Sequence, residues 1–418
     1  MFVFNDAVHD RRVLLEADAL QKAGWTVTVH ACASAGVAHA DVESRDSGVK
    51  IVRHRGDSLA LNQRGSLLPK VMLRIAWSAL SLSSQIARRV APAWGRRLAA
   101  ARRLVAWATQ AAAGASDQGY LHAHDLTGGL PALLARSKRH QLVYDSHEIF
   151  LETAGMASVP RLLRKAAATF LEKPLIARAD AFITVNFAVQ EELGRRYRLP
   201  RHQLVLFNCA ERIAPGTSAD SPLRSAIGVG PETVVVLYHG GLTAVRGIPQ
   251  LLQASRDPRL ASVHFAFMGY GEMTEEIKGV ASTDPRIHYV PAVSPDELVT
   301  WISSANVSVM LNRAESLNEL CSTPNKLFEA IAAEVPVISS DFPERRRIVL
   351  DGDGGALGVV CDPDNIDSIV DAIVETTMSG PEYDRALRKR IRHAASTRWN
   401  WASESRKLVE LYRILSAS

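Results

Sequence analysis

The chain has 418 residues, of which 47% are hydrophobic and 22% are charged. This length suits two domains of about 200 residues each, and this composition excludes a disordered or fibrous protein. The net charge is +5, but residues 1–210 hold 28 Lys and Arg against 17 Asp and Glu, so we expect the N-terminal half to face an anionic partner.

Targeting and redox signals are weak in this sequence. No run of about 18 apolar residues occurs, and the N-terminus lacks the order of charged, apolar and small residues that marks a secretion signal. We therefore expect a cytoplasmic protein. The four cysteines lie far apart with no CxxC pair, which argues against a disulfide framework or a structural zinc site.

In the first half of the chain, short apolar runs alternate with helical patterns, which is typical of a doubly wound parallel sheet. Strands are expected at residues 2–4, 25–31, 120–123, 141–145 and 181–185. Residues 67–113 are predicted to form two helices, each with an apolar face and a basic face. Nine basic residues and no acidic one lie between Asp57 and Asp117: Arg64, Lys70, Arg74, Arg88, Arg89, Arg96, Arg97, Arg102 and Arg103.

This basic block has three possible meanings. It attracts nucleic acid, it attracts an anionic membrane surface, or it is a solvated helix face. The segment also holds Trp77, Trp94 and Trp107, which suit the headgroup layer of a bilayer. We predict that residues 67–113 attach peripherally to the inner face of the cell membrane. No nucleic-acid partner is expected, because the block lacks aromatic stacking repeats.

A turn-rich stretch, Ala-Pro-Gly-Thr-Ser-Ala-Asp-Ser-Pro, interrupts the pattern near the middle of the chain. We expect an N-terminal domain at 1–210, a linker at 211–222 and a C-terminal domain at 223–398. A second alternating series follows, with strands expected at residues 234–239, 263–268, 287–290, 307–311, 336–339 and 357–360. Residues 399–414 predict an amphipathic helix.

Two glycine-rich turns follow strands of this second series. His-Gly-Gly-Leu-Thr-Ala-Val-Arg-Gly occupies residues 239–247, and Gly-Tyr-Gly-Glu occupies residues 269–272. Ligands bind beyond the carboxyl ends of parallel strands, where glycine lets the backbone approach a phosphate and Arg246 can add a forked cation. A strand-to-helix turn needs glycine in any case, so a purely structural role stays open.

The run Thr-Pro-Asn-Lys-Leu-Phe-Glu at residues 323–329 predicts a helix that begins near Pro324. Lys326 lies near the positive end of the helix dipole, where a cation is unfavourable without an anionic ligand. Glu329 shares its helix face and can accept two ribose hydroxyls. The alternative is an ion pair between Lys326 and Glu329 on a surface helix.

These motifs occur along the chain in the same order as in a known protein family. The second half resembles the nucleotide-sugar domain of the GT-B glycosyltransferases of family 4, with the two glycine-rich turns, then PNKLFE, then PVI. The first half is similar to the same family in Asp-Arg-Arg-Val at 10–13, His-Ala-His-Asp at 122–125 and Tyr-Asp-Ser-His-Glu at 144–148. The resemblance covers nearly the whole chain. It implies an α/β GT-B fold, two Rossmann-like domains with doubly wound parallel sheets that face a cleft, with residues 399–418 packing back on the N-terminal domain.

The resemblance also implies a function. A hexose-type sugar would pass, with retention, from a UDP- or GDP-sugar to a hydroxyl of a lipid-linked or glycan acceptor, as in cell envelope polysaccharide synthesis. The implied catalytic residues are His124, Arg246 and Lys326. The implied donor-binding residues are Gly240, Gly241, Arg246, Gly247, Gly269, Gly271, Asn325, Lys326 and Glu329, and the acceptor-side residues are Asn5, His9, Asp10, Asp125, His147 and Glu148. Neither a cofactor nor a metal is expected, because fixed positive charge would stabilise the leaving diphosphate.

The chain departs from the family pattern at two positions of interest. Cys321 stands where many relatives have a Glu that contacts the donor sugar, while Glu315 and Glu319 are near but out of register. Backbone N–H groups around residues 320–323 are the expected substitutes. Glu334 follows the PNKLFE helix where relatives usually have Gly, so either the helix ends differently or the backbone stores strain.

Three other functions are alternatives to the predicted glycosyl transfer. A nucleotide-sugar epimerase of GT-B architecture needs no second substrate, so the basic acceptor side argues against it. A dinucleotide-dependent oxidoreductase needs GxGxxG after the first strand, and residues 5–10 contain no glycine. A basic protein that only binds nucleic acid or membranes stays open from charge alone.

Overall fold

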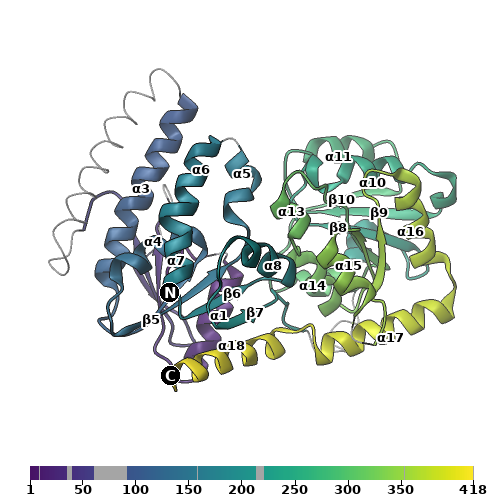
Figure 1. Cartoon of the computed structure of the whole chain (residues 1–418). Helices are drawn as coiled ribbons and strands as arrows, with labels where there is room; N and C mark the ends of the chain where they lie inside the picture. Colours follow the sequence, from purple (N-terminus) through teal and green to yellow (C-terminus); the bar gives the residue numbers. More distant parts are fainter. Residues whose placement is uncertain are drawn as a thin grey trace.

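The structure is a computed structural model that describes residues 1–8, 10–34, 40–60, 92–157, 159–212, 221–352 and 354–417. Figure 1 shows two α/β halves side by side, the N-terminal half in purple to teal and the C-terminal half in green. Each half has its own sheet, as the two alternating series of the sequence predict.

The N-terminal sheet has two parts that the first residues of the chain join. The order is β2-β3-β1 in one part and β4-β5-β6-β7 in the other, and Phe2 forms a bridge to each part. The backbone N–H of Phe2 donates to the carbonyl of His122 at 2.8 Å, and that of Val3 donates to the carbonyl of His30 at 3.1 Å. The strands are β1 (Thr28–Cys32), β2 (Val42–Ser44), β3 (Lys50–His54), β4 (Gly119–His124), β5 (His140–Ser146), β6 (Ala181–Thr184) and β7 (His202–Val205).

One edge strand of the N-terminal sheet departs from the parallel direction of the others. Strand β2 pairs with β3 in the antiparallel direction, whereas the other strand pairs of this sheet are parallel. A short turn joins the two strands, closed by a hydrogen bond from Arg45 N–H to the Val49 carbonyl. So short a connection permits only an antiparallel pair.

The helices of the N-terminal half are α1 (Arg11–Lys22), α3 (Pro92–Gly114), α4 (Asp125–Ala135), η1 (Phe150–Glu152), α5 (Ala154–Ala157), α6 (Arg161–Ala167), η2 (Ala168–Glu172), α7 (Lys173–Arg178) and α8 (Phe187–Arg196). Of the predicted helix pair at 67–113, residues 67–91 lie outside the described residues. In α3, Trp107 is buried, with its ring centroid 5.2 Å from that of Phe4. Trp107 is therefore a core residue, and its predicted place in a headgroup layer is wrong because the domain interior covers it.

The C-terminal sheet is parallel throughout, in the order β10-β9-β8-β11-β12-β13. Its strands are β8 (Val234–His239), β9 (Val263–Met268), β10 (Ile287–Val290), β11 (Val307–Met310), β12 (Val337–Ser340) and β13 (Gly358–Cys361), all within one residue of prediction. The helices around it are α9 (Pro222–Ile227), η3 (Ala244–Arg246), α10 (Ile248–Ala254), η4 (Pro258–Leu260), α11 (Thr274–Ala281), α12 (Leu298–Ser303), α13 (Leu317–Cys321), α14 (Asn325–Ala332), α15 (Pro343–Leu350), α16 (Ile366–Met378) and α17 (Pro381–Thr397).

The last helix, α18 (Trp401–Ser416), returns to the N-terminal half, in yellow beneath α1 in Figure 1. Its apolar face is buried in the same core as strand β1 and helix α1. The Tyr412 hydroxyl lies 2.8 Å from Nδ1 of His122, and Glu404 accepts the backbone N–H of Phe207 at 3.0 Å. The boundaries at 210 and 222 stay predictions, because residues 213–220 of the linker lie outside the described residues.

Within the described ranges, every helix is too short or too polar to cross a bilayer.

Candidate active site

The C-terminal half carries a pocket of about 590 Å³, which we call the C-terminal pocket, at the carboxyl ends of β8 and β9. Gly240, Gly241 and Gly269 line it, whereas Gly247 and Gly271 pack behind it. A Cβ atom on Gly247 would lie 2.2 Å from the carbonyl oxygen of Leu311. A Cβ atom on Gly271 would meet backbone equally closely, so these two glycines serve the turns and not the pocket wall.

Two cations converge on the C-terminal pocket. Lys326, the second residue of α14, is buried, and its Nζ donates to the Tyr238 hydroxyl at 2.7 Å. Arg246 reaches in from η3, since a Cβ atom on Gly241 would lie 3.1 Å from its Nη1 atom. Burial, with the nearby charge of Arg246, lowers the pKa of Lys326 well below its usual value. An anion in the pocket would relieve this unfavourable charge.

Glu329 lies one turn further along α14 and lines the same pocket. Its Oε2 atom lies 3.1 Å from Nε2 of His239, the last residue of β8. Burial opposes the charge of Glu329, but the hydrogen bond from His239 and nearby positive charge outweigh it, so the pKa of Glu329 falls. The carboxylate is ionised and can accept hydroxyl donors. The alternative of a surface pair with Lys326 does not occur, because Lys326 is buried against Tyr238.

Glu319, which sequence reasoning set aside as out of register, also lines the C-terminal pocket. Its Oε1 atom accepts from Nδ2 of Asn312 at 2.9 Å and from Nη2 of the buried Arg345 at 3.2 Å. Cys321 is buried instead and packs in the core of the N-terminal half. Helix α13 therefore turns Glu319 toward the pocket and Cys321 away from it.

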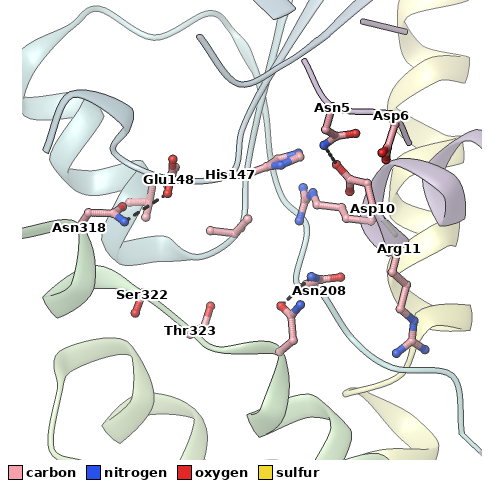
Figure 2. Close-up of a pocket in the computed structure, with 14 residues that line it drawn as sticks. Asn5, Asp6, Asp10, Arg11, His147, Glu148, Asn208, Asn318, Ser322 and Thr323 are labelled. Atoms are coloured by element: carbon pink, nitrogen blue, oxygen red, sulfur yellow. Dashed lines mark hydrogen bonds between the residues drawn. The ribbon is translucent and has the colours of Figure 1, made fainter. Parts of the chain in front are cut away.

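A second pocket, of about 540 Å³, lies between the halves and is here called the cleft pocket. Residues from both halves line it, and hydrogen bonds cross it, as Figure 2 shows. Nδ2 of Asn208 donates to Oδ1 of Asn325 at 2.7 Å, and the backbone N–H of Ile149 donates to Oδ1 of Asn318 at 2.8 Å. Ser322 and Asn325 line both pockets, so the two pockets adjoin at the start of α14.

Most of the predicted acceptor-side residues line the cleft pocket: Asn5, Asp10, His147 and Glu148. Asn5 donates to Asp10, which caps α1 by accepting the backbone N–H of Val13. His9 lies outside the described residues. Burial and the charge of Asp125 raise the pKa of Glu148 to about 7. Asp125 lies behind His147 and accepts its backbone N–H at 2.9 Å.

Two sequence families match this chain. The family described as glycosyl transferases group 1 matches residues 233–378, and the glycosyl transferase 4-like domain matches residues 9–210. The chain belongs to the glycosyl transferases group 1 family. The matched ranges include the C-terminal pocket and most of the N-terminal wall of the cleft pocket.

Curated relatives in the glycosyltransferase family are distant. A D-inositol 3-phosphate glycosyltransferase of Corynebacterium urealyticum is 24% identical over 260 residues, which is 58% of this chain and 59% of the relative. The putative glycosyltransferase EpsD of Bacillus subtilis is 26% identical over 313 residues, 71% of this chain and 76% of EpsD. The chain thus spans about three fifths of the first of these relatives.

Solved structures confirm the GT-B fold. Sucrose-phosphate synthase of Thermosynechococcus elongatus has a TM-score of 0.69 at 18% identity, covering 97% of this chain and 92% of that one. HepE of Anabaena with UDP and glucose has a TM-score of 0.64 at 15% identity, covering 100% of this chain and 99% of that one. The predicted fold class is therefore correct.

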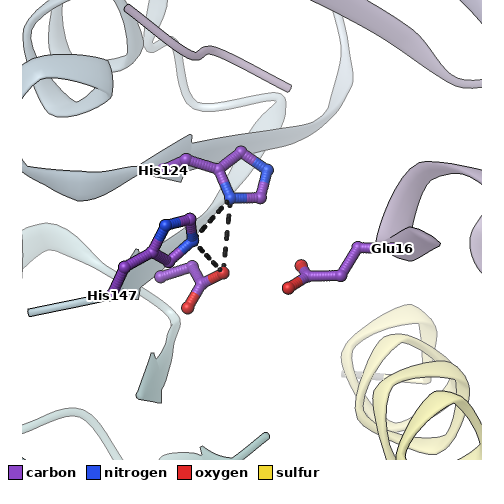
Figure 3. Close-up of side chains that lie close together, drawn as sticks. Glu16, His124 and His147 are labelled. Atoms are coloured by element: carbon purple, nitrogen blue, oxygen red, sulfur yellow. Dashed lines mark hydrogen bonds and ion pairs between the residues drawn. The ribbon is translucent and has the colours of Figure 1, made fainter. Parts of the chain in front are cut away.

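His124, one of the predicted catalytic residues, lies at the end of β4 and is buried behind the cleft pocket. Figure 3 shows it beside His147 and Glu16. Its Nδ1 atom lies 3.2 Å from Nε2 of His147 and 3.3 Å from Oδ2 of Asp145. His147 lines the cleft pocket and His124 does not, so contact between His124 and a sugar stays a prediction.

The buried carboxylates beside His124 form ion pairs with a neighbouring arginine. Arg12 lies 2.9 Å from Asp145 and 2.9 Å from Glu16, both buried. Burial and the adjacent His122 lower the pKa of His124 well below its usual value. Glu16, His124, Asp145 and His147 have the chemistry of metal ligands, and their ligand atoms lie within 4.8 Å of one another. Because the Arg12 guanidinium already occupies this carboxylate pair, the group suits proton sharing better than a metal ion.

Among the residues that sequence reasoning missed, Glu319 and Asn318 line the pockets and Tyr238 supports Lys326 from behind. Tyr238 holds Lys326 through its hydroxyl, which also donates to the Gly241 carbonyl at 2.7 Å. A tyrosine that follows four aliphatic residues in this strand was the signal that could have identified it. Asn318 had no such signal, because its partners lie in the other half of the chain.

Proposed function

We propose that the protein transfers a hexose-type sugar, with retention, from a UDP- or GDP-sugar to a hydroxyl of a lipid-linked or glycan acceptor. One observation carries this proposal: two pockets adjoin at Ser322 and Asn325. The C-terminal pocket holds two cations and an ionised carboxylate, which suit a diphosphate and a ribose. The cleft pocket presents polar side chains from the N-terminal half, which suit a hydroxylated acceptor.

In the proposed reaction the main task is to stabilise the departing diphosphate. Arg246, Lys326 and the N-terminus of α14 hold positive charge where negative charge grows, and this charge needs no rearrangement during the reaction. Glu329 takes the ribose hydroxyls, and Glu319 takes hydroxyls of the donor sugar. These fixed charges do the work that a metal ion does elsewhere, so the proposal requires no metal and no cofactor.

On the acceptor side, His147 and Glu148 are two of the titratable groups that line the cleft pocket. With a pKa of about 7, Glu148 can accept the proton or the hydrogen bond of an acceptor hydroxyl near neutral pH. His124 supports this wall from behind through its contact with His147.

Relatives support the substrate classes. Structures of HepE contain UDP and UDP-glucose, which supports a nucleotide-sugar donor here. The name of D-inositol 3-phosphate glycosyltransferase describes transfer to a hydroxylated acceptor, which supports an acceptor hydroxyl here. We place the protein in the cytoplasm, peripheral on the membrane, without a nucleic-acid partner. The epimerase alternative is less favoured, because an epimerase has no use for the second pocket.

The test is a panel of UDP- and GDP-hexoses incubated with the protein and a membrane lipid extract. We expect release of nucleoside diphosphate, and proton NMR of the product should show the anomeric configuration of the donor. The Arg246→Ala variant should lower the transfer rate more than the donor affinity. Its control is Arg256→Ala, an exposed arginine outside both pockets. An inverted product contradicts retention, and an epimerised donor without diphosphate release supports the epimerase.

A further inference from the structure

An exposed apolar cluster lies on the N-terminal half, along α6 and η2. Leu162, Leu163 and Phe170 are 77%, 52% and 79% exposed. The other large hydrophobic side chains that are exposed in the described ranges come one each from five separate segments: Val42, Val245, Tyr270, Met378 and Ile414. Single exposed side chains need no explanation, whereas a cluster marks an interaction surface.

The cluster belongs to a firmly packed segment. On its inner side, Ala167, Ala168 and Leu171 pack against the core that contains Trp107. Glu172 is buried and accepts the Tyr197 hydroxyl. The outer side chains are therefore exposed because the inner side of the segment is already used, and not because the helix is loose.

Basic residues surround the cluster. Residues 161–178 include five basic residues, Arg161, Arg164, Lys165, Lys173 and Arg178, and a single acidic residue, the buried Glu172. Arg161, Lys165 and Lys173 are exposed beside the apolar side chains. Exposed Leu and Phe framed by Lys and Arg match the interface of an anionic bilayer, with hydrocarbon for the apolar tips and phosphate for the cations. A second copy on the same surface would instead bring like charges together.

We propose that Leu162, Leu163 and Phe170 insert into an anionic bilayer and hold the protein on it. This deepens the membrane attachment of the proposed function and assigns it to α6 and η2. Nη1 of Arg164 donates to the carbonyl of Leu151 at 3.4 Å, in the segment that follows Glu148 at the cleft pocket. A lipid-linked acceptor in the bilayer would thus lie beside the wall that receives it. In Figure 1, α6 lies on the N-terminal half between α3 and α5, and α5 faces the C-terminal half.

The test is co-sedimentation of the full chain with phosphatidylcholine vesicles that contain none or about a third phosphatidylglycerol. The triple variant Leu162→Ser, Leu163→Ser, Phe170→Ser should lower the vesicle partition coefficient at least about tenfold, since each buried apolar side chain contributes to insertion. The triple variant Arg161→Gln, Lys165→Gln, Lys173→Gln should keep weak binding and lose its dependence on phosphatidylglycerol. Phe170→Trp should gain fluorescence quenching by brominated lipid over the wild type.

The matched control is Val42→Ser, Met378→Ser, Ile414→Ser, three exposed apolar residues outside the cluster, which should bind vesicles like the wild type. Unchanged partition of the Leu162, Leu163 and Phe170 variant overturns the proposal. A dimer in light scattering that this variant abolishes, with vesicle binding retained, also overturns it and assigns the surface to a second copy. Donor turnover without vesicles is measured in parallel, so that failure of membrane binding is distinguished from failure of glycosyl transfer.

Discussion

Nε2 of His147 lies 3.0 Å from Oδ2 of Asp145. On the other side of the ring, Nδ1 lies 3.3 Å from Oδ2 of Asp125. Burial opposes a charge on this ring, but the two carboxylates outweigh it and raise the pKa of His147 to about 9. The ring is therefore an imidazolium at neutral pH that donates from both nitrogens, in the wall of the cleft pocket.

The first prediction concerns stability and pH. The pKa of His147 in the folded state lies above its ordinary value of 6.5, so its proton stabilises the folded state fully below pH 6.5. This contribution, at most about 3 kcal/mol, is lost as the pH rises through 9. His147→Gln should be less stable than the wild type in urea unfolding at pH 6, and the gap should narrow by about pH 9.5. Asp125→Asn should lower the pKa of His147, so the pH range over which this stabilisation is lost should move to lower pH. A gap that is constant with pH contradicts the imidazolium assignment.

The second prediction concerns the ribose contact. Glu329→Ala should weaken binding of a nucleoside diphosphate by about 2 kcal/mol, the usual worth of charge-assisted hydrogen bonds. Isothermal titration calorimetry measures this loss. The control is Glu334→Ala, which removes a carboxylate that pairs with Arg212 and Arg392 away from the pocket. If wild type and Glu329→Ala bound the nucleoside diphosphate equally well, the Glu329 carboxylate would contact His239 and not the ribose.

The third prediction separates the sugar from the nucleotide. Glu319→Gln should weaken binding of the nucleotide sugar by about 1–2 kcal/mol while binding of the free nucleoside diphosphate stays the same. The amide keeps the side-chain shape but loses the charge that Arg345 supports. Competition binding with both ligands decides the matter. An equal loss for both ligands would mean that Glu319 shapes the whole pocket through Arg345.

The fourth prediction concerns Glu148. Burial and Asp125 raise its pKa to about 7, so the folded state favours the protonated form, and stability is lost as the pH rises from 4.5 through 7. Glu148→Gln should remove this loss and be relatively more stable than the wild type at pH 8. The transfer rate of the wild type should rise through pH 7, and that of Glu148→Gln should be lower and flat. A rise that persists in the variant assigns this titration to another group.

The C-terminal sheet was predictable because parallel strands buried on both faces appear as continuous apolar runs. Strands β2, β3 and β7 of the N-terminal half were missed, and β2 is short, polar and exposed. The turn at Glu334 was correctly expected to be unusual: its φ is +60°, so the backbone carries strain just after α14.

The site was predictable where its residues are close in sequence. Lys326 and Glu329 share one helix, and Gly240, Gly241 and Arg246 share one turn, so local spacing was sufficient. The partners that define their chemistry, such as Tyr238, come from distant segments that only folding brings together. For the same reason, the enclosure of His124 behind His147 could not be inferred from spacing along the strand.

In the proposed reaction, Lys326 and Arg246 bind the diphosphate of a nucleotide sugar in the C-terminal pocket. The most direct measurement is the thermal unfolding midpoint of wild type, Lys326→Ala and Arg246→Ala with UDP, GDP, their hexose conjugates, NAD and FAD, since only a ligand of the native state raises it. We predict that UDP or GDP raises the wild-type midpoint about as much as its hexose conjugate, and that both substitutions reduce the shift. Stabilisation by NAD or FAD, with none by a nucleoside diphosphate, would rule out a nucleotide-sugar site in this pocket.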